Sequence, residues 1–371
     1  MRLNGREMRT IRVDDDGRRV HVIDQTRLPH RIETRLLADC AAAETAIRDM
    51  IVRGAPLIGV TGAYGLALAM AADPSDAAIE AAATRLLATR PTAVNLRWAL
   101  ERMRAVLMTA PPTARPSLAY AEAGQIAEED VAACSAIGDH GAALILDMAR
   151  GLDRPLNILT HCNAGWLATV DWGTALAPIY KAARAGARLH VWVDETRPRN
   201  QGASLTACEL SGEGVPHTVI ADNAGGHLMQ HGMVDLAIVG SDRTTRVGDV
   251  CNKIGTYLKA LAAHANDVPF YVALPGSTID WRLRDGVTEI PIEERDPREV
   301  THISGLHADG DIVEICLTPE GATARNFGFD VTPARYISGL ITERGLCPAT
   351  EDGLAALYPD YADDGSGGRG P

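Results

Sequence analysis

The stretch 157–173, NILTHCNAGWLATVDWG, contains the junction that decides the fold. An apolar run at 156–159 stops at a four-residue polar turn, 160–163, and an alanine-rich pattern then continues to about residue 187. This order predicts a strand, a tight turn and a helix. In open α/β sheets, ligands sit at the carboxyl end of such a strand, because the N–H groups of the following helix favour anions.

Cys162 lies in the turn of this stretch. At a helix N-terminus a thiol gains thiolate character, because the positive end of the helix dipole stabilises the anion. The sequence therefore predicts a reactive cysteine at a ligand-binding edge. A lone cysteine is more often a small buried apolar side chain, and this stretch by itself leaves both interpretations open.

Length and composition indicate a soluble globular protein of two domains. Of its 371 residues, 46% are hydrophobic and 23% are charged, and the net charge is −12. The chain exceeds the usual size of one hydrophobic core. Its lysines and arginines are dispersed, so neither nucleic acid nor a membrane is expected as a partner. The N-terminal MRLNGREMRT lacks an apolar targeting segment, which predicts a cytoplasmic protein.

The seven cysteines form no metal-binding or disulfide pattern. No two of them have the two-residue spacing of zinc knuckles, and the histidines form no paired motif such as HExxH. An odd number of free thiols is typical of a reducing compartment. We therefore expect neither a metal nor another cofactor.

The first 152 residues are predicted to form a mainly helical domain with a small antiparallel sheet. Two segments rich in β-branched residues, 10–13 and 19–24, flank the turn signal DDDG at 14–17 and predict a hairpin. From residue 39 the pattern is alanine-rich with a period of 3.6 residues. It predicts helices at 41–52, 57–71, 75–88 and 93–108, and one or two helices at 116–152.

A second domain is predicted at 153–358, after the helix-disfavouring segment DRP. Apolar strand-like runs alternate there with helical stretches, which is typical of a doubly wound parallel sheet in an α/β fold. The predicted strands are 156–159, 190–193, 217–221, 236–239, 270–274 and 312–315. The predicted helices are 164–187, 202–213, 224–231 and 252–266. The last residues, 359–371, end in DDGSGGRGP and are expected to be a disordered tail.

Polar residues follow several of these strands, at the sheet edge expected to hold Cys162. One strand is followed by GSDR at 240–243, which places the Asp242 carboxylate at a strand end. A structural ion pair with Arg243 is the alternative for this carboxylate. Lys253 falls in the first turn of a predicted helix, where a cation opposes the helix dipole, so an anionic ligand would compensate it.

Three turns that contain arginine also suit an anion. RPRNQG at 197–202 leads into a predicted helix, and both guanidinium and helix N–H groups favour phosphate. Arg53 and Arg90 each precede another predicted helix. Arginines in such turns are more often solvated than functional, but two of them before helix starts fit a phosphate site.

Eight motifs, in this order, resemble those of the methylthioribose-1-phosphate isomerases of methionine salvage: RGAPLIGV, RPTAVNL, THCNAG, DETRPRNQGA, GSDR, GDVCNKIGTY, IPIEERDPREV and FDVTPA. The resemblance runs from about residue 8 to 345, and the family is related to regulatory subunits of the guanine-exchange factor for initiation factor two. It implies an N-terminal helical domain, a Rossmann-like catalytic domain and a homodimer that binds a small sugar phosphate. It also implies that Cys162 and Asp242 are the catalytic pair. The positions matched to substrate binding are Arg53, Gly54, Ala55, Arg90, Gln201, Asn252 and Lys253.

The substrate implied by this resemblance sets a chemical requirement. Its anomeric oxygen carries phosphate, so the sugar ring cannot open to a free aldehyde. An acid must protonate the ring oxygen, and hydrogen must move from C2 to C1. A carboxylic acid with a raised pKa can supply the proton near neutral pH, and a thiol can handle the second transfer. We therefore interpret Asp242 as the proton donor and Cys162 as the acid/base, with proton and hydride transfer both open.

Two departures from the family pattern lie beside the expected site. Ser204 and Cys208 stand where the family has Arg and Trp, and TTRV at 244–247 replaces a smaller apolar run. These changes leave the 5-substituent of the sugar open, so 5-deoxyribose 1-phosphate is an alternative substrate. Ribose 1,5-bisphosphate is another. The non-enzyme alternative is a regulatory subunit of a guanine-exchange factor.

Overall fold

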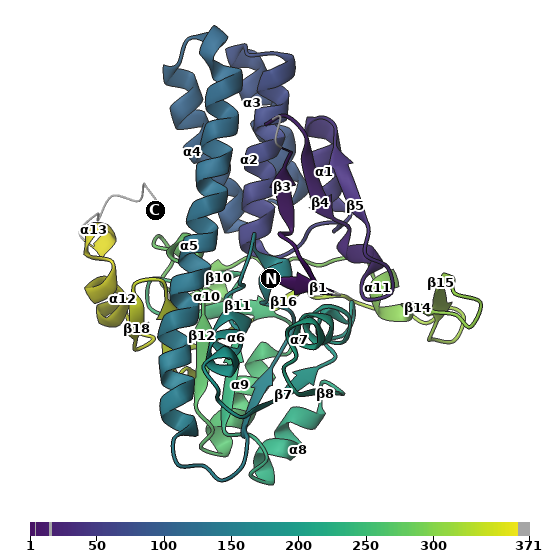
Figure 1. The fold of residues 1–371 in the computed structure, drawn as a ribbon, viewed down its shortest axis with the longest axis vertical. Coiled ribbons are helices and arrows are strands. Elements are labelled where there is room, and N and C mark those ends of the chain that lie inside the picture. The colour runs from purple at the N-terminus through teal and green to yellow at the C-terminus, as the bar shows by residue number, and fades with distance from the viewer. Residues whose placement is uncertain (4, 15–16, 363–371) are drawn as a thin grey trace.

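The computed structural model describes residues 1–3, 5–14 and 17–362. It consists of a helical part and a sheet part, and the long helix α5 (Arg115–Ala149) runs from one to the other (Figure 1). The small sheet near the N-terminus is antiparallel and the large C-terminal sheet is mainly parallel. The predicted α/β fold class is therefore confirmed.

The small N-terminal sheet contains the predicted hairpin. β3 (Ile11–Val13) pairs antiparallel with β4 (Val20–Ile23), and β4 pairs antiparallel with β5 (Thr34–Leu37). Residues 15 and 16 of the predicted turn lie outside the described residues. β5 was not predicted, because only its last residue is buried and its sequence TRLL shows no apolar alternation. Two shorter strands, β1 (Arg2–Leu3) and β2 (Arg6–Glu7), pair with each other.

Four helices follow close to their predicted positions: α1 (Cys40–Arg48), α2 (Ala55–Ala72), α3 (Asp76–Thr89) and α4 (Val94–Thr109). The side chains of Asp39 and Ser75 cap α1 and α3 by accepting a backbone N–H from the first turn. By length and composition α2 could cross a membrane, but 83% of it is buried inside the protein. It is therefore the core helix of this bundle.

The large sheet has the strand order β18-β17-β12-β9-β6-β7-β8, and every neighbouring pair except β17 with β18 is parallel. Its strands are β6 (Leu156–Thr160), β7 (Leu189–Asp194), β8 (His217–Ile220), β9 (Leu236–Val239), β12 (Phe270–Ala273), β17 (Gly339–Thr342) and β18 (Gly345–Cys347). The chain runs outward from β6 to β8 and then returns to β9, on the other side of β6. This reversal creates a topological switch point, and ligands of open α/β sheets bind at the carboxyl ends of the strands there.

Several smaller elements complete the second part of the chain. The helices between strands are α6 (Leu176–Arg184), α7 (Ala207–Glu213), α8 (Ala224–Gln230) and α9 (Thr256–Ala265), and a π-helical turn at Gly202–Thr206 leads into α7. A second sheet has the order β13 (Ile279–Asp280), β10 (Arg243–Thr245), β11 (Val250–Lys253) and β16 (Phe329–Thr332). The strands β14 (His302–Leu306) and β15 (Ile312–Cys316) form a hairpin that projects from the body (Figure 1). Short helices are α10 (Gly286–Glu289), α11 (Arg298–Thr301), α12 (Glu351–Leu357) and α13 (Pro359–Ala362).

Two of the predicted helices begin later than expected. The helix predicted at 164–187 is wrong in its first half, because α6 begins only at Leu176. A buried carboxylate from α7, Glu209, accepts the N–H groups of Trp166 and Leu167 and holds this segment in a single 3-10 turn. The helix predicted at 252–266 begins at Thr256, because the residues before it pair as β11 with two other strands.

Two predictions near the C-terminus also need correction. A strand exists near 312–315, but it pairs with β14 in the projecting hairpin and does not join the parallel sheet. The short helix α13 occupies the first residues of the expected disordered tail, and the ring of Tyr361 stacks 5.7 Å from that of Trp281. Residues 363–371 of the expected tail lie outside the described residues.

Candidate active site

The switch point brings Cys162 and Asp242 to the same edge of the sheet. Cys162 follows the end of β6 by two residues, and Asp242 follows the end of the neighbouring β9 by three. The two groups are close enough that the charge of Asp242 raises the pKa of the thiol, although burial raises it more. The prediction that these two strand ends converge is supported by this geometry.

The backbone around Cys162 is tightly held. The residue has a left-handed conformation with φ 65°, its N–H donates to Thr196 Oγ1 at 2.8 Å, and its carbonyl accepts from Thr206 Oγ1 at 2.7 Å. The expected helix N-terminus is absent after Cys162, because α6 begins only at Leu176. Burial raises the pKa of the thiol, against the opposing effect of Arg53 and Lys253. This environment favours the neutral thiol over the thiolate more than an exposed cysteine does.

Asp242 lies at the centre of several charges. Burial raises the pKa of its carboxyl group, while Lys253, Arg53 and Arg90 oppose that rise. The alternative ion pair with Arg243 is not formed, because Arg243 donates to the carbonyl of Thr92 and lies 3.8 Å from Asp280. A carboxyl group in this position favours its protonated form more than an exposed aspartate does.

Lys253 is the last residue of β11, not part of a helix. Its side chain is buried, and its ammonium nitrogen lies 4.8 Å from the ring centroid of Phe329. Burial lowers the pKa of this amine. Within the part of the chain that the structure describes, no carboxylate forms an ion pair with this ammonium. An anionic ligand is therefore still expected, because the charge is buried and unpaired and not because of a helix dipole. The neighbouring Asn252 donates to Thr256 Oγ1 at 3.0 Å.

The N-terminal part contributes two predicted arginines, Arg53 and Arg90. Arg53 is buried and donates to the carbonyl of Asn163 at 2.7 Å and to its side-chain oxygen. Arg90 donates to Glu293 at 2.8 Å, so its charge is paired in this structure. Gly54 follows Arg53 as the residue before α2, with φ 96°, and Ala55 is the first residue of that helix.

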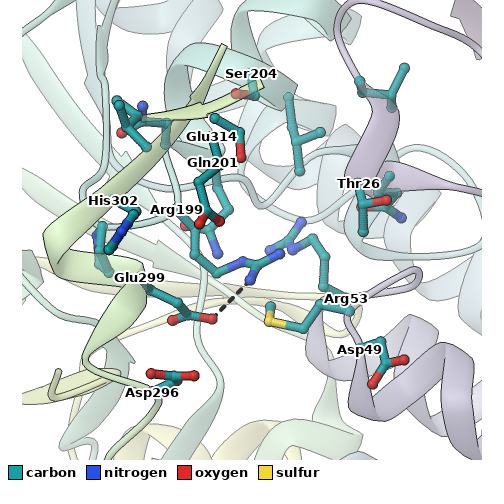
Figure 2. Close-up of a pocket in the computed structure, with 18 of the residues that line it drawn as sticks. Thr26, Asp49, Arg53, Arg199, Gln201, Ser204, Asp296, Glu299, His302 and Glu314 are labelled. Atoms are coloured by element: carbon teal, nitrogen blue, oxygen red, sulfur yellow. Dashed lines mark hydrogen bonds and ion pairs between the residues drawn. The ribbon is translucent and has the colours of Figure 1, made fainter. Parts of the chain in front are cut away.

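Arg53 also lines a cavity of about 470 Å³. Arg53 reaches it from the helical part, and Gln201 and Ser204 line it from the segment after β7 (Figure 2). The amide oxygen of Gln201 is buried and has no hydrogen-bond partner among the described residues. The remaining predicted residues, Gly54, Ala55, Arg90, Cys162, Asp242, Asn252 and Lys253, do not line this cavity. Arg53 and Gln201 are therefore the predicted site residues that line the cavity.

A buried polar cluster next to Cys162 was not predicted. His161 places Nδ1 2.8 Å from Asp194 Oδ2 and Nε2 2.8 Å from the carbonyl of Ile254. His161, Asp194 and Asp222 could hold a metal ion by their spacing. The ammonium of Lys259 lies 3.2 Å from the same Asp194 oxygen and donates to the carbonyl of Asp222. Lys259 thus pairs with Asp194, and the backbone N–H groups of Thr196 and Arg197 donate to the Asp222 carboxylate, so these oxygens already have partners within the protein.

The chain also matches known proteins over almost its full length. The sequence profile of the Initiation factor 2 subunit family matches residues 51–349. A methylthioribose-1-phosphate isomerase from Methylorubrum extorquens is 65% identical, over 97% of this chain and 99% of that one. The crystal structure of 5-methylthioribose 1-phosphate isomerase from Pyrococcus horikoshii has a TM-score of 0.81 at 38% identity, with coverage of 96% and 97%. The chain belongs to the methylthioribose-1-phosphate isomerase family.

Membership of this family supports an isomerase activity, but proteins described in other terms share the fold. A chain from A. fulgidus described as translation initiation factor eIF-2B, subunit delta, is also 38% identical, with a TM-score of 0.78 and coverage of 95% and 100%. Fold alone therefore does not separate the family's enzymes from its regulatory subunits. The distinction depends on the chemistry of the residues at the switch point.

Proposed function

We propose that this protein converts 5-methylthioribose 1-phosphate into 5-methylthioribulose 1-phosphate, a step of methionine salvage. The observation that carries the proposal is the meeting of a buried thiol, Cys162, with a half-buried carboxyl group, Asp242, beside the buried cations Arg53 and Lys253. A regulatory subunit has no need for this combination.

The phosphate of the substrate is bound by the cations. Lys253 has no ion pair within the described residues and its pKa is lowered by burial, so a phosphate would restore its charge. Arg53 and the N–H groups at Gly54 and Ala55 lie at the start of α2, where an anion is favoured. The free amide oxygen of Gln201 suits a sugar hydroxyl. Asn252 and Arg90 complete the proposed set, with Arg90 released from Glu293.

The two catalytic groups divide the chemistry. Asp242 in its protonated form donates to the ring oxygen, and the C1–O bond of the ring breaks. Hydrogen then moves from C2 to C1 while the C2 hydroxyl becomes a carbonyl. Cys162 is the acid/base for the proton that must leave or return in this step. Turnover in deuterated water distinguishes the two routes, since proton transfer puts deuterium on C1 and hydride transfer does not.

Product analysis with three sugar phosphates tests the proposed substrate. Methylthioribose 1-phosphate is expected to be converted with the highest kcat/KM, compared with 5-deoxyribose 1-phosphate and ribose 1,5-bisphosphate. Among the residues that depart from the family pattern, Ser204 lines the cavity, whereas Cys208 packs against the core of the large sheet and residues 244–247 do not line the cavity. A higher kcat/KM for another of these sugars would replace the substrate. No conversion of any of them would favour the regulatory role.

We further propose that the protein is a cytoplasmic homodimer with domains at 1–152 and 153–358. Three hydrophobic clusters support the division, one among α1 to α4 and the first half of α5, and two that contain residues of the large sheet. The second half of α5 packs on the sheet from Ile137 onward. Light scattering of the purified protein is expected to give twice the chain mass of 39.5 kDa, and a monomer would contradict the proposal.

A further inference from the structure

Glu209 is a fully buried carboxylate at the start of α7 that takes part in none of the steps above. It accepts four hydrogen bonds. One oxygen accepts from the Asn163 side chain at 2.8 Å and the Leu167 N–H at 3.0 Å. The other accepts from the Trp166 N–H at 2.9 Å and the Tyr180 hydroxyl at 2.6 Å. Within the described residues no cation forms an ion pair with Glu209, so these four donors hold the carboxylate.

The carboxylate is joined to the active site through Asn163. The side chain of Asn163 donates to Glu209 and accepts from Arg53, while its carbonyl accepts a second bond from Arg53. Asn163 also donates to Thr206 Oγ1 at 3.2 Å, and that hydroxyl donates to the carbonyl of Cys162. One asparagine thus connects the buried carboxylate both to the arginine and to the catalytic turn.

The chain is built to bring this carboxylate close. A Cβ atom on Gly165 would lie 1.8 Å from Glu209 Oε2, so only glycine fits at that position. Burying a carboxylate without a cation is costly, and four well-placed donors offset that cost. Burial raises the pKa of the carboxyl group, while the hydrogen bonds oppose this rise. An apolar side chain would fill the same space at a lower cost in free energy. A buried carboxylate is therefore expected here because it fixes the positions of the groups that donate to it.

We propose that Glu209 is a positioning residue that sets the direction of the Arg53 guanidinium and the conformation of the Cys162 turn through Asn163. The inference rests on the proposed function, since it takes Arg53 as a phosphate ligand. Glu209 itself does not touch the substrate. Loss of the Glu209 carboxylate is expected to raise KM by misplacing Arg53 and to lower kcat by disturbing the Cys162 turn.

The variant Glu209→Gln tests the proposal. An amide has one acceptor oxygen, so at least one of the N–H or O–H donors loses its partner and Asn163 is no longer held. We expect KM for methylthioribose 1-phosphate to rise about tenfold, because a hydrogen bond to a charged group is being misdirected. The matched control is Glu213→Gln on the same helix, whose carboxylate pairs with Arg184 away from the site. The control is expected to keep the wild-type KM, and an unchanged KM in Glu209→Gln would overturn the proposal.

A double-variant cycle separates positioning from a purely structural role. If Glu209 acts through Asn163, Glu209→Gln combined with Asn163→Ala raises KM no more than the larger single effect. Additive effects would overturn the inference. If Glu209→Gln does not fold, Tyr180→Phe decides, because it removes one donor to Glu209 and keeps the packing of the ring. We then expect KM to rise about threefold, and no change would overturn it.

A binding measurement keeps this inference distinct from the proposed function. Inorganic phosphate is expected to raise the thermal midpoint of the wild-type protein, by a mass-action effect that needs no turnover. The rise is expected to be smaller in Glu209→Gln than in Glu213→Gln. If the wild type shows this rise but does not convert the sugar, the proposed function fails and Glu209 still positions an anion site. An equal rise in both variants would contradict the role of Glu209.

Discussion

At the scale of single residues, burial moves three groups of the site toward their neutral forms. It raises the pKa of the Cys162 thiol and of the Asp242 carboxyl group, and it lowers the pKa of the Lys253 amine. Each shift costs stability in the ionised form. Neutral acid groups can donate protons to a sugar, and an amine that gains its charge beside a phosphate binds it strongly.

The variant Cys162→Ser is expected to lose turnover and keep substrate binding. A hydroxyl has nearly the same shape as the thiol, but its pKa is far too high for an acid/base role. We expect kcat to fall more than about tenfold, which is roughly 1.4 kcal/mol in the barrier, with KM nearly unchanged. Steady-state kinetics measure both. A variant that kept more than a tenth of wild-type kcat would remove Cys162 from the catalytic pair.

The variant Asp242→Asn is expected to be inactive and at least as stable as the wild type at neutral pH. Because the pKa of Asp242 is raised in the folded state above its unfolded value near 3.8, the folded protein binds the proton more tightly. Stability contributed by that proton is present below the unfolded pKa and lost as pH rises through the folded pKa. Asparagine does not ionise, so the thermal midpoint of the variant should fall less between pH 4 and pH 7 than that of the wild type. An active variant with a lowered midpoint would sink the acid assignment.

The variant Lys253→Met is expected to bind substrate poorly and unfold at a higher temperature. The pKa of Lys253 is lowered in the folded state, so the unfolded chain holds this proton more tightly and the charged form destabilises the fold at neutral pH. Methionine removes that cost. A charge-assisted contact to phosphate is worth about 1.5–3 kcal/mol, so KM should rise more than about tenfold. Unchanged kinetics would show that Lys253 does not contact the substrate.

At the scale of elements, the start of α2 depends on Gly54. Its φ of 96° is unfavourable for other residues, and a Cβ atom there would lie 2.4 Å from the carbonyl oxygen of Ala168. Gly54→Ala should therefore move the start of α2 away from the 3-10 turn and raise KM. Gly151→Ala is the matched control, because φ is 80° there and nothing lies within 4 Å of the added atom. Equal kinetics in the two variants would contradict a role for this close approach.

Most helices and parallel strands could be predicted from local periodicity, and so could the placing of Asp242 after β9. The segment after Cys162 could not, because the carboxylate of Glu209 that holds it lies more than 40 residues away in sequence. The same holds for the contact between His161 and Asp194, which lie in two separate motifs 33 residues apart. Local periodicity predicts a helix at Lys253, because the pairing of β11 with β16 that makes it a strand residue joins segments far apart in the chain.

At the scale of the whole molecule, the helical part and the large sheet meet at the switch point. Arg53 comes from the helical part, whereas Cys162 and Asp242 come from the ends of β6 and β9. The site is therefore complete only when both parts are correctly packed. The same fold carries a chain described as an initiation factor subunit, so we propose that activity depends on these few groups and not on the architecture.

The most direct test of the central claim follows methylthioribose 1-phosphate by nuclear magnetic resonance, with the wild-type protein and with the double variant Cys162→Ser, Asp242→Asn. The wild type is expected to convert the sugar into the ketose with its phosphate intact. The double variant is expected to leave the sugar unchanged and still to unfold in a cooperative thermal transition. Conversion by the double variant at a rate near that of the wild type, or no conversion by the wild type, would contradict the account.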